Sequence, residues 1–125
     1  MLIGENLHII SKRTKEAIFE RDSDYVLDNI KKQFDNGIRT VDLNIGPAKG
    51  RAADSLAWLI ELISGKYDVN FSLDTTNLEE MKKGFSCLKN TKDAFLNSTS
   101  ADEEKLKNTV QIASKYDANL IALTM

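Results

Sequence analysis

The sequence predicts an α/β fold built from repeated parallel strand–helix units, with about five strands and four main helices. Short apolar runs alternate with helical patterns along the chain, and most of these runs end in an acid or amide side chain. The runs are continuously apolar, as in strands whose two faces are both covered. With 125 residues, 42% of them hydrophobic, and no Gly/Ser-rich linker, residues 1–125 are expected to form one partial domain without an internal boundary.

The five predicted strands come from these apolar runs, and they cover residues 2–5, 39–45, 69–74, 93–97 and 119–124. One strand–helix unit fits between successive strand ends, and eight such units make the roughly 250 residues of a (β/α)₈ barrel. Five units correspond to the amino-terminal half of that barrel. A doubly wound open sheet is the alternative, but the residues after the first strand read GENLHII and lack its glycine-rich phosphate loop.

The four predicted helices follow from apolar spacing at three and four residues. Residues 7–21 are expected to be irregular, with at most a helical turn over 14–20, and the first main helix runs from Asp22 to a stop at Gly37. Capping boxes starting at Thr76 and Ser100 open the third and fourth helices. The predicted buried stripes are Val26, Ile30 and Phe34; Leu56, Leu59, Ile60 and Ile63; Leu78, Met81, Phe85 and Leu88; and Leu106, Val110 and Ala113.

The carboxyl ends of parallel strands meet on one side of the fold, so the polar residues there are candidate ligand contacts. These residues are Glu5, Asn6, Asp42, Asn44, Asp74 and Asn97. Asp74 is the strongest candidate, because a carboxylate can accept hydrogen bonds from two ring N–H groups. The alternative for Asp74 is a structural acid at the start of the next helix, a task that Thr76 and Asn77 can perform.

The other candidates each have a competing structural interpretation. Asn97 offers a donor and an acceptor to a ligand, or forms a local Asx turn. Asp42 and Asn44 flank Leu43, so one of them is expected to face the site, as a ligand contact or as a support for other residues. Glu5 and Asn6 are weaker candidates because so short a strand fixes their facing poorly.

Several charged and reactive residues have roles that the sequence leaves open. Lys49 and Arg51 could meet an anionic ligand tail, or they could be solvated loop charges. His8 is the only histidine and has no Cys/His/Asp cluster beside it, so no protein-bound metal is expected. The single cysteine, Cys87, excludes an internal disulfide and is consistent with a cytoplasmic protein. The net charge of −2 argues against nucleic acid or a membrane surface as the main partner, and no signal peptide or membrane span is evident.

Taken in order, the strand-end motifs resemble those of the pterin-binding methyltransferases. The motifs are IGEN (3–6), DLNIGPAKG (42–50), SLDTTN (72–77), LNSTS (96–100) and LIALTM (120–125). The nearest group is the methyltetrahydrofolate:corrinoid/iron–sulfur protein methyltransferases, which are (β/α)₈ barrels. The folate-binding domain of cobalamin-dependent methionine synthase and dihydropteroate synthase are more distant.

The resemblance implies that Asp74 and Asn97 bind the pterin, with Asp42 and Asn44 beside it. NIGPAKG stands where dihydropteroate synthases have a double-glycine motif containing serine, which favours methyl transfer over pterin condensation. After Gly4-Glu5 the family commonly has Arg, whereas Asn6 stands here. The family's residue near N5 lies on a later strand, so the catalytic residue is expected beyond Met125.

The implied function is one-carbon metabolism: methyl transfer from methyltetrahydrofolate to the cobalt of a corrinoid protein. As a truncated barrel, the 125-residue chain is expected to lack turnover by itself. The alternatives are a non-catalytic pterin-binding module or assembly half, a dihydropteroate synthase-like enzyme, and a plain structural fragment. The open sheet edges predict self-association into a homo-oligomer.

Overall fold

Five parallel strands form one sheet in the order β1-β2-β3-β4-β5, so every strand lies beside its neighbours in the sequence. The computed structural model describes residues 3–8, 11–45, 52–100 and 102–123, and for residues 5–8 and 52 the backbone alone. The elements are β1 (Ile3–His8), α1 (Lys12–Phe19), α2 (Ser23–Asp35), β2 (Thr40–Asn44), α3 (Ala52–Ser64), β3 (Asn70–Asp74), α4 (Leu78–Cys87), β4 (Phe95–Thr99), α5 (Glu103–Tyr116) and β5 (Asn119–Ala122). The predicted parallel (β/α) repeat is confirmed.

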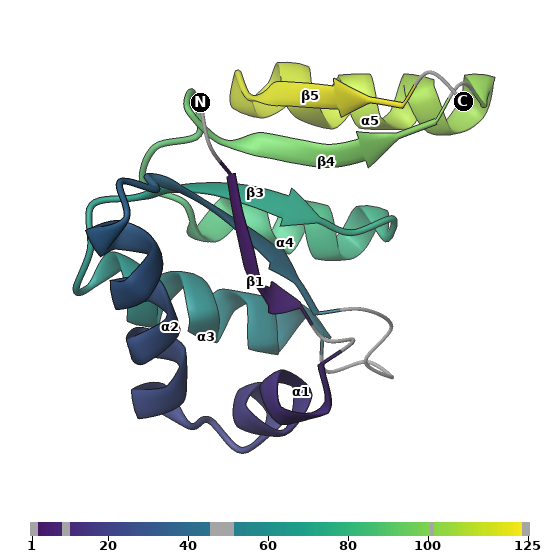
Figure 1. Cartoon of the computed structure of the whole chain (residues 1–125). Coiled ribbons are helices and arrows are strands. Elements are labelled where there is room, and N and C mark those ends of the chain that lie inside the picture. The colour runs from purple at the N-terminus through teal and green to yellow at the C-terminus, as the bar shows by residue number, and fades with distance from the viewer. Residues whose placement is uncertain (1–2, 9–10, 46–51, 101, 124–125) are drawn as a thin grey trace.

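The helices cover one side of the sheet, which twists strongly from β5 to β1 (Figure 1). Figure 1 shows α3, α4 and α5 behind the strands and β1 crossing in front of them. Sequential strand order with helices on the outside is the arrangement of a (β/α) barrel wall. Among the described residues, no helix is long and apolar enough to span a membrane.

The core lies between the sheet and its helices. The predicted stripe of α3 is confirmed, since all four of its residues are at most 1% exposed: Leu56, Leu59, Ile60 and Ile63. Gly84 of α4 lies directly against this layer, because a Cβ built there would approach the side chains of Leu56 and Leu73 to 2.7 Å. The absence of a side chain at Gly84 therefore allows α4 to pack closely on the sheet.

The predicted buried face of α5 is partly wrong. Leu106 and Val110 are 37% and 47% exposed, whereas Thr109 and Ile112 are buried together with the predicted Ala113. Thr109 can occupy a buried position because its hydroxyl donates to the backbone carbonyls of Lys105 and Leu106. The i, i+4 spacing of Leu106 and Val110 predicted the wrong buried face, because Thr109 occupies the buried position with its hydroxyl hydrogen-bonded.

Both predicted capping boxes are displaced along the chain. The N-cap of α4 is Asn77, whose Oδ1 accepts from the amides of Glu79 and Glu80, and the N-cap of α5 is Asp102. Thr76 and Ser100 lie outside these helices. Asn and Asp are as effective N-caps as Ser, and here the caps are Asn77, one residue after Thr76, and Asp102, two residues after Ser100.

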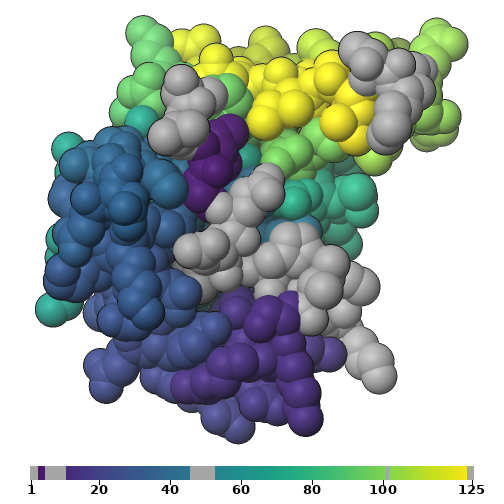
Figure 2. Space-filling view, in the orientation of Figure 1, coloured from purple at the N-terminus to yellow at the C-terminus, as the bar shows by residue number. Residues whose placement is uncertain are grey.

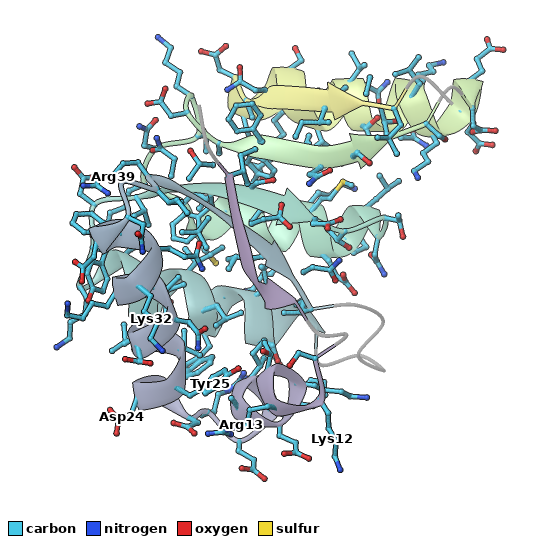
Figure 3. All side chains as sticks on the ribbon, viewed as in Figure 1. Lys12, Arg13, Asp24, Tyr25, Lys32 and Arg39 are labelled. Atoms are coloured by element: carbon cyan, nitrogen blue, oxygen red, sulfur yellow. The ribbon has the colours of Figure 1, made fainter. Side chains whose placement is uncertain are left out.

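The connection from β1 to β2 contains a helix, α1, that the sequence predicts only as a possible turn. Ser11 caps α1 through the amide of Thr14, and Asp22 caps α2 through the amide of Tyr25. Arg13 donates to Asp22 at 2.9 Å, and its guanidinium lies 4.4 Å from the ring centre of Tyr25. Figure 3 shows Arg13 and Tyr25 together between the two helices, so this corner holds α1 against α2.

Two strands differ from their predicted bounds in ways that affect the site. β4 extends to Thr99, so Asn97 lies in the middle of the strand and not at its end. In β1 the register slips between Gly4 and Leu7, so Glu5 and Asn6 form an irregular step against β2. A bulge of this kind interrupts the alternation of side chains, which explains why sequence spacing alone could not assign their facing.

Candidate functional site

The two faces of the sheet differ in chemistry, and the candidate residues share one of them. In β2, Asp42 and Asn44 point to the side opposite Leu43, because alternate residues of a strand face opposite ways. We call the polar side the inner face (Thr40, Asp42, Asn44, Ser72, Asp74 and Asn97) and the helix-covered side the outer face (Val41, Leu43, Phe71, Leu73 and Leu96). The sequence predicted that one of these two residues would face the candidate site, and in the structure both Asp42 and Asn44 do.

Register brings the strongest candidates together. Asp74 is the last residue of β3 and lies directly opposite Asn97 of β4. The backbone amide of Thr75 donates to the carbonyl of Asn97 at 3.1 Å and so ties the two strands just beyond this point. Both side chains are half-buried, which leaves them accessible to a ligand on the inner face.

Two carboxylate–amide hydrogen bonds organise the inner face. Asn44 Nδ2 donates to Asp74 Oδ2 at 3.0 Å, joining β2 to β3. Asn97 Nδ2 donates to Asp42 Oδ1 at 3.1 Å, joining β4 to β2 across the intervening strand. Each bond joins side chains from two strands, so the two pairs hold the four side chains relative to one another.

Asp74 does not serve as the helix cap that was its alternative role. The cap of α4 is made by Asn77, and the hydroxyl of Thr75 accepts from the amide of Asn77 while donating to Glu80 at 2.7 Å. Asn77 thus has the capping role predicted for Thr76, and Thr75 links Asn77 to Glu80. The start of α4 is therefore satisfied without Asp74, and its carboxylate remains directed to the inner face.

Ser72 belongs to the inner face but was not predicted. It lies opposite Asp42 in the register, two residues before Asp74 on the same strand, and is fully buried. Its hydroxyl has no hydrogen-bond partner within the described part of the chain. The i, i+2 spacing from Asp74 is the signal that could have found it. A buried hydroxyl without a partner costs free energy, so Ser72 is an energetically unfavourable residue of the inner face.

The remaining predicted candidates lie outside the described residues. The side chains of Glu5, Asn6 and His8 are not described, although their backbone runs through β1. Lys49 and Arg51 fall in the segment 46–51, which is not described. In the parts of the chain that are described, no group of three or more His, Cys, Asp or Glu side chains could hold a metal ion.

The chemistry of the inner face suits a flat ligand with N–H groups along one edge. Carboxylate oxygens can accept hydrogen bonds from such groups, and the half-buried Asp74 presents a carboxylate on this face. The half-buried aromatic side chain of Phe95 lies on the same face, since Phe95 is opposite Ser72 in the register. A separate hollow of about 330 Å³ lies at the opposite, amino-terminal end of β3, lined by 64–71 and 88–90, away from these residues.

Comparisons with known proteins agree with the sequence motifs. A family model described as pterin binding enzyme matches residues 10–125. The chain is also 25% identical over 126 residues to methylcorrinoid:tetrahydrofolate methyltransferase of Eubacterium limosum. That alignment covers 99% of this chain and 46% of the relative, so the chain spans about half the length of the curated protein it matches.

Proposed function

Because this chain belongs to the pterin-binding enzyme family, we propose that its inner face holds a methyltetrahydrofolate-type pterin for methyl exchange with the cobalt of a corrinoid protein. The observation that carries this proposal is the direct opposition of Asp74, where β3 ends, and Asn97 of β4. Their side chains offer a carboxylate and an amide to the same small region. The 2-amino-4-oxo edge of a pterin carries N–H donors and a carbonyl that complement such a pair.

Each site residue has a proposed part in binding. Asp74 accepts hydrogen bonds from the ring N–H groups with the oxygen that Asn44 leaves available, and Asn97 contacts the adjacent ring position. Asp42 and Asn44 contact the ring or hold the residues that do. Glu5 and Asn6 are included on the family resemblance, as the strand that carries them lies beside β2.

The proposed reaction moves one methyl group between two carriers, N5 of the folate and the cobalt of the corrinoid. The name of the Eubacterium limosum relative places the methyl group on the corrinoid at the start. The sequence motifs had suggested the opposite direction. Binding and orienting the pterin so that N5 faces the corrinoid is the same requirement in both directions, and orientation of this kind accounts for a large part of rate enhancement.

Methyl transfer at N5 also requires control of the proton or hydrogen bond at that nitrogen. On the described inner face, each of the two carboxylates accepts a hydrogen bond from an amide, and a carboxylate has no hydrogen to donate to N5. We therefore propose that these strands bind the pterin and that the group acting at N5 belongs to another part of the barrel. The 125-residue chain by itself is expected to bind without turnover, and residues 1–125 act as one partial domain.

The binding part of the proposal is tested by titrating tetrahydrofolate and methyltetrahydrofolate into the protein. Asp74→Asn and Asn97→Ala should each weaken binding by about 1–3 kcal/mol, because each leaves buried polar atoms unpaired. Asn70→Ala is the matched control, since Asn70 lies on the same side of β3 at the far end of the strand. Equal affinity in all variants would refute a pterin site here.

The transfer part is tested by assaying methyl-corrinoid formation and its reverse, with a free cobalamin as the carrier. The 125-residue chain and a version extended to the length of the relative are compared. Turnover by the extended protein alone supports the proposal. Pterin binding without turnover in both would favour the alternative, a non-catalytic pterin-binding module.

We also propose that the chain self-associates through its sheet edges and that it is cytoplasmic. Among the described strands, β1 and β5 each pair on one side only, and β5 lies along the surface of the molecule in Figure 2. Unpaired strand edges are templates for association. A strictly monomeric species in sedimentation at high concentration would contradict this proposal.

A further inference from the structure

Asp42 and Asn97 differ in exposure although they share a hydrogen bond. Asp42 is 2% exposed, whereas Asn97 is half-buried. The bond runs from Asn97 Nδ2 on β4 to Asp42 Oδ1 on β2 and passes over the strand between them. The carboxylate of Asp42 is therefore shielded from solvent, whereas the side chain of Asn97 stays partly accessible.

The chemistry of this pair fixes the orientation of the amide. Because Asn97 Nδ2 donates to Asp42 Oδ1, the amide of Asn97 turns its NH₂ group toward Asp42. The carbonyl oxygen of Asn97 then points away from Asp42. Without the carboxylate, the amide could rotate by half a turn and exchange its donor and acceptor at little cost.

We propose that Asp42 is a positioning residue that sets the hydrogen-bond polarity of Asn97 and so selects which pterin-like rings bind. This inference rests on the proposed function and deepens it. Because Asp42 is buried, it acts through Asn97 and not by contact with the ring. With the carbonyl of Asn97 held toward the ligand and the Asp74 carboxylate opposite, the site selects a ring edge that donates N–H groups. A ring that presents an acceptor at the same place meets a second acceptor and is rejected.

The test compares two flat ligands of nearly the same shape, 2-amino-4-oxopteridine and 2,4-dioxopteridine. In the second compound the amino donor at position 2 is replaced by a carbonyl acceptor, and the neighbouring N1 becomes an N–H group. Dissociation constants for both are measured in the whole polypeptide that carries this sequence. Wild type should prefer the amino compound by about tenfold or more, the effect of one mismatched buried hydrogen bond.

The deciding variant is Asp42→Asn, which keeps the size of the side chain but can donate as well as accept. Asn97 is then free to turn, and the preference between the two ligands should fall by about tenfold. The double variant Asp42→Asn/Asn97→Asp restores a one-way hydrogen bond, in which the amide introduced at position 42 is the donor, and again presents an acceptor to the ligand. It should recover the wild-type preference.

Asp93→Asn is the matched control, because Asp93 also accepts from an asparagine, Asn90, at 2.8 Å but on the exposed surface. It should leave the preference unchanged. If Asp42→Asn weakens both ligands equally, Asp42 is a structural residue and the inference is wrong while the proposed function stands. If wild type binds neither ligand, the proposed function is overturned and the inference with it.

Discussion

The outer and inner faces of the sheet bury neighbouring residues of the same strand for opposite reasons. Leu73 and Ser72 are both fully buried on β3, yet Leu73 packs in the apolar core while the Ser72 hydroxyl lies in a polar layer. The outer face gains stability in proportion to the apolar area it buries. The inner face gains little from burial, since each polar atom there needs a matching partner. Stability and recognition are thus divided between the two sides of one sheet.

The largest expected effect is on the outer face. Leu73→Ala should lower the free energy of unfolding by about 2–5 kcal/mol, because it removes buried methyl groups and leaves a cavity. Chemical denaturation measures this change. Leu123→Ala is the control, since Leu123 is 42% exposed and its truncation should cost less than about 0.5 kcal/mol. A small loss of unfolding free energy in Leu73→Ala would mean that neighbouring side chains of the outer face fill the cavity.

Gln33 is a polar exception on the outer side, and replacing it should sharpen the contrast. Gln33 of α2 is 3% exposed, packs against Gly4, and has no partner for either amide atom among the described residues. Gln33→Met keeps the side-chain length and removes both unpaired groups, so the free energy of unfolding should rise by about 1–3 kcal/mol. Lys32→Met on the exposed side of the same helix is the control. A loss of stability would show that the amide is bonded in solution.

A smaller effect is expected at Ser72. Ser72→Ala removes an unpaired hydroxyl from the inner face, so the change in unfolding free energy should be under about 1 kcal/mol and in the stabilising direction. The comparison with Leu73→Ala, one residue away, tests the division between the faces directly. A loss similar to that of Leu73→Ala would show that the hydroxyl holds an ordered water molecule or packs as part of the core.

The smallest effect is expected at the exposed corner of α1 and α2. The hydrogen bond from the Tyr25 amide, and then the one from Arg13, lower the pKa of Asp22 below its usual value of 3.8. A lowered pKa means stability that is present above pH 3.8 and is lost as the pH falls through the lower folded value. The free energies of unfolding of wild type and Asp22→Asn, measured as a function of pH, should therefore differ above this window and converge below it. A constant difference between the two free energies of unfolding at every pH would contradict a lowered pKa of Asp22.

The outer face was largely predictable from the sequence, and the inner face only in part. The stripe of α3 follows from apolar spacing alone, because a helix that packs on a sheet needs such a stripe. Strand alternation also placed Asp42 and Asn44 opposite Leu43. The stripe of α5 failed because Thr109 satisfies its own hydroxyl, a local bond that hydrophobic spacing does not register.

The hydrogen bonds of the inner face could not be predicted. The bond from Asn97 to Asp42 joins strands that are not neighbours, so it depends on the twist and curvature of the whole sheet. The bulge at Glu5 and Asn6 likewise arises from the pairing of β1 with β2. Sequence spacing tells which residues share a face, whereas tertiary packing decides which of them touch.

A substitution at Gly84, on the helix side of the sheet, can change ligand affinity without touching a ligand. A methyl group added there would come to 2.7 Å from the side chains of Leu56 and of Leu73, the residue immediately before Asp74. Where the two leucine side chains cannot turn aside in the packed core, the helix moves outward or the strand moves forward, and a strand that moves carries its terminal carboxylate with it. Selection, or a protein engineer, could therefore adjust ligand binding from the outside of the barrel wall while every recognition residue stays the same.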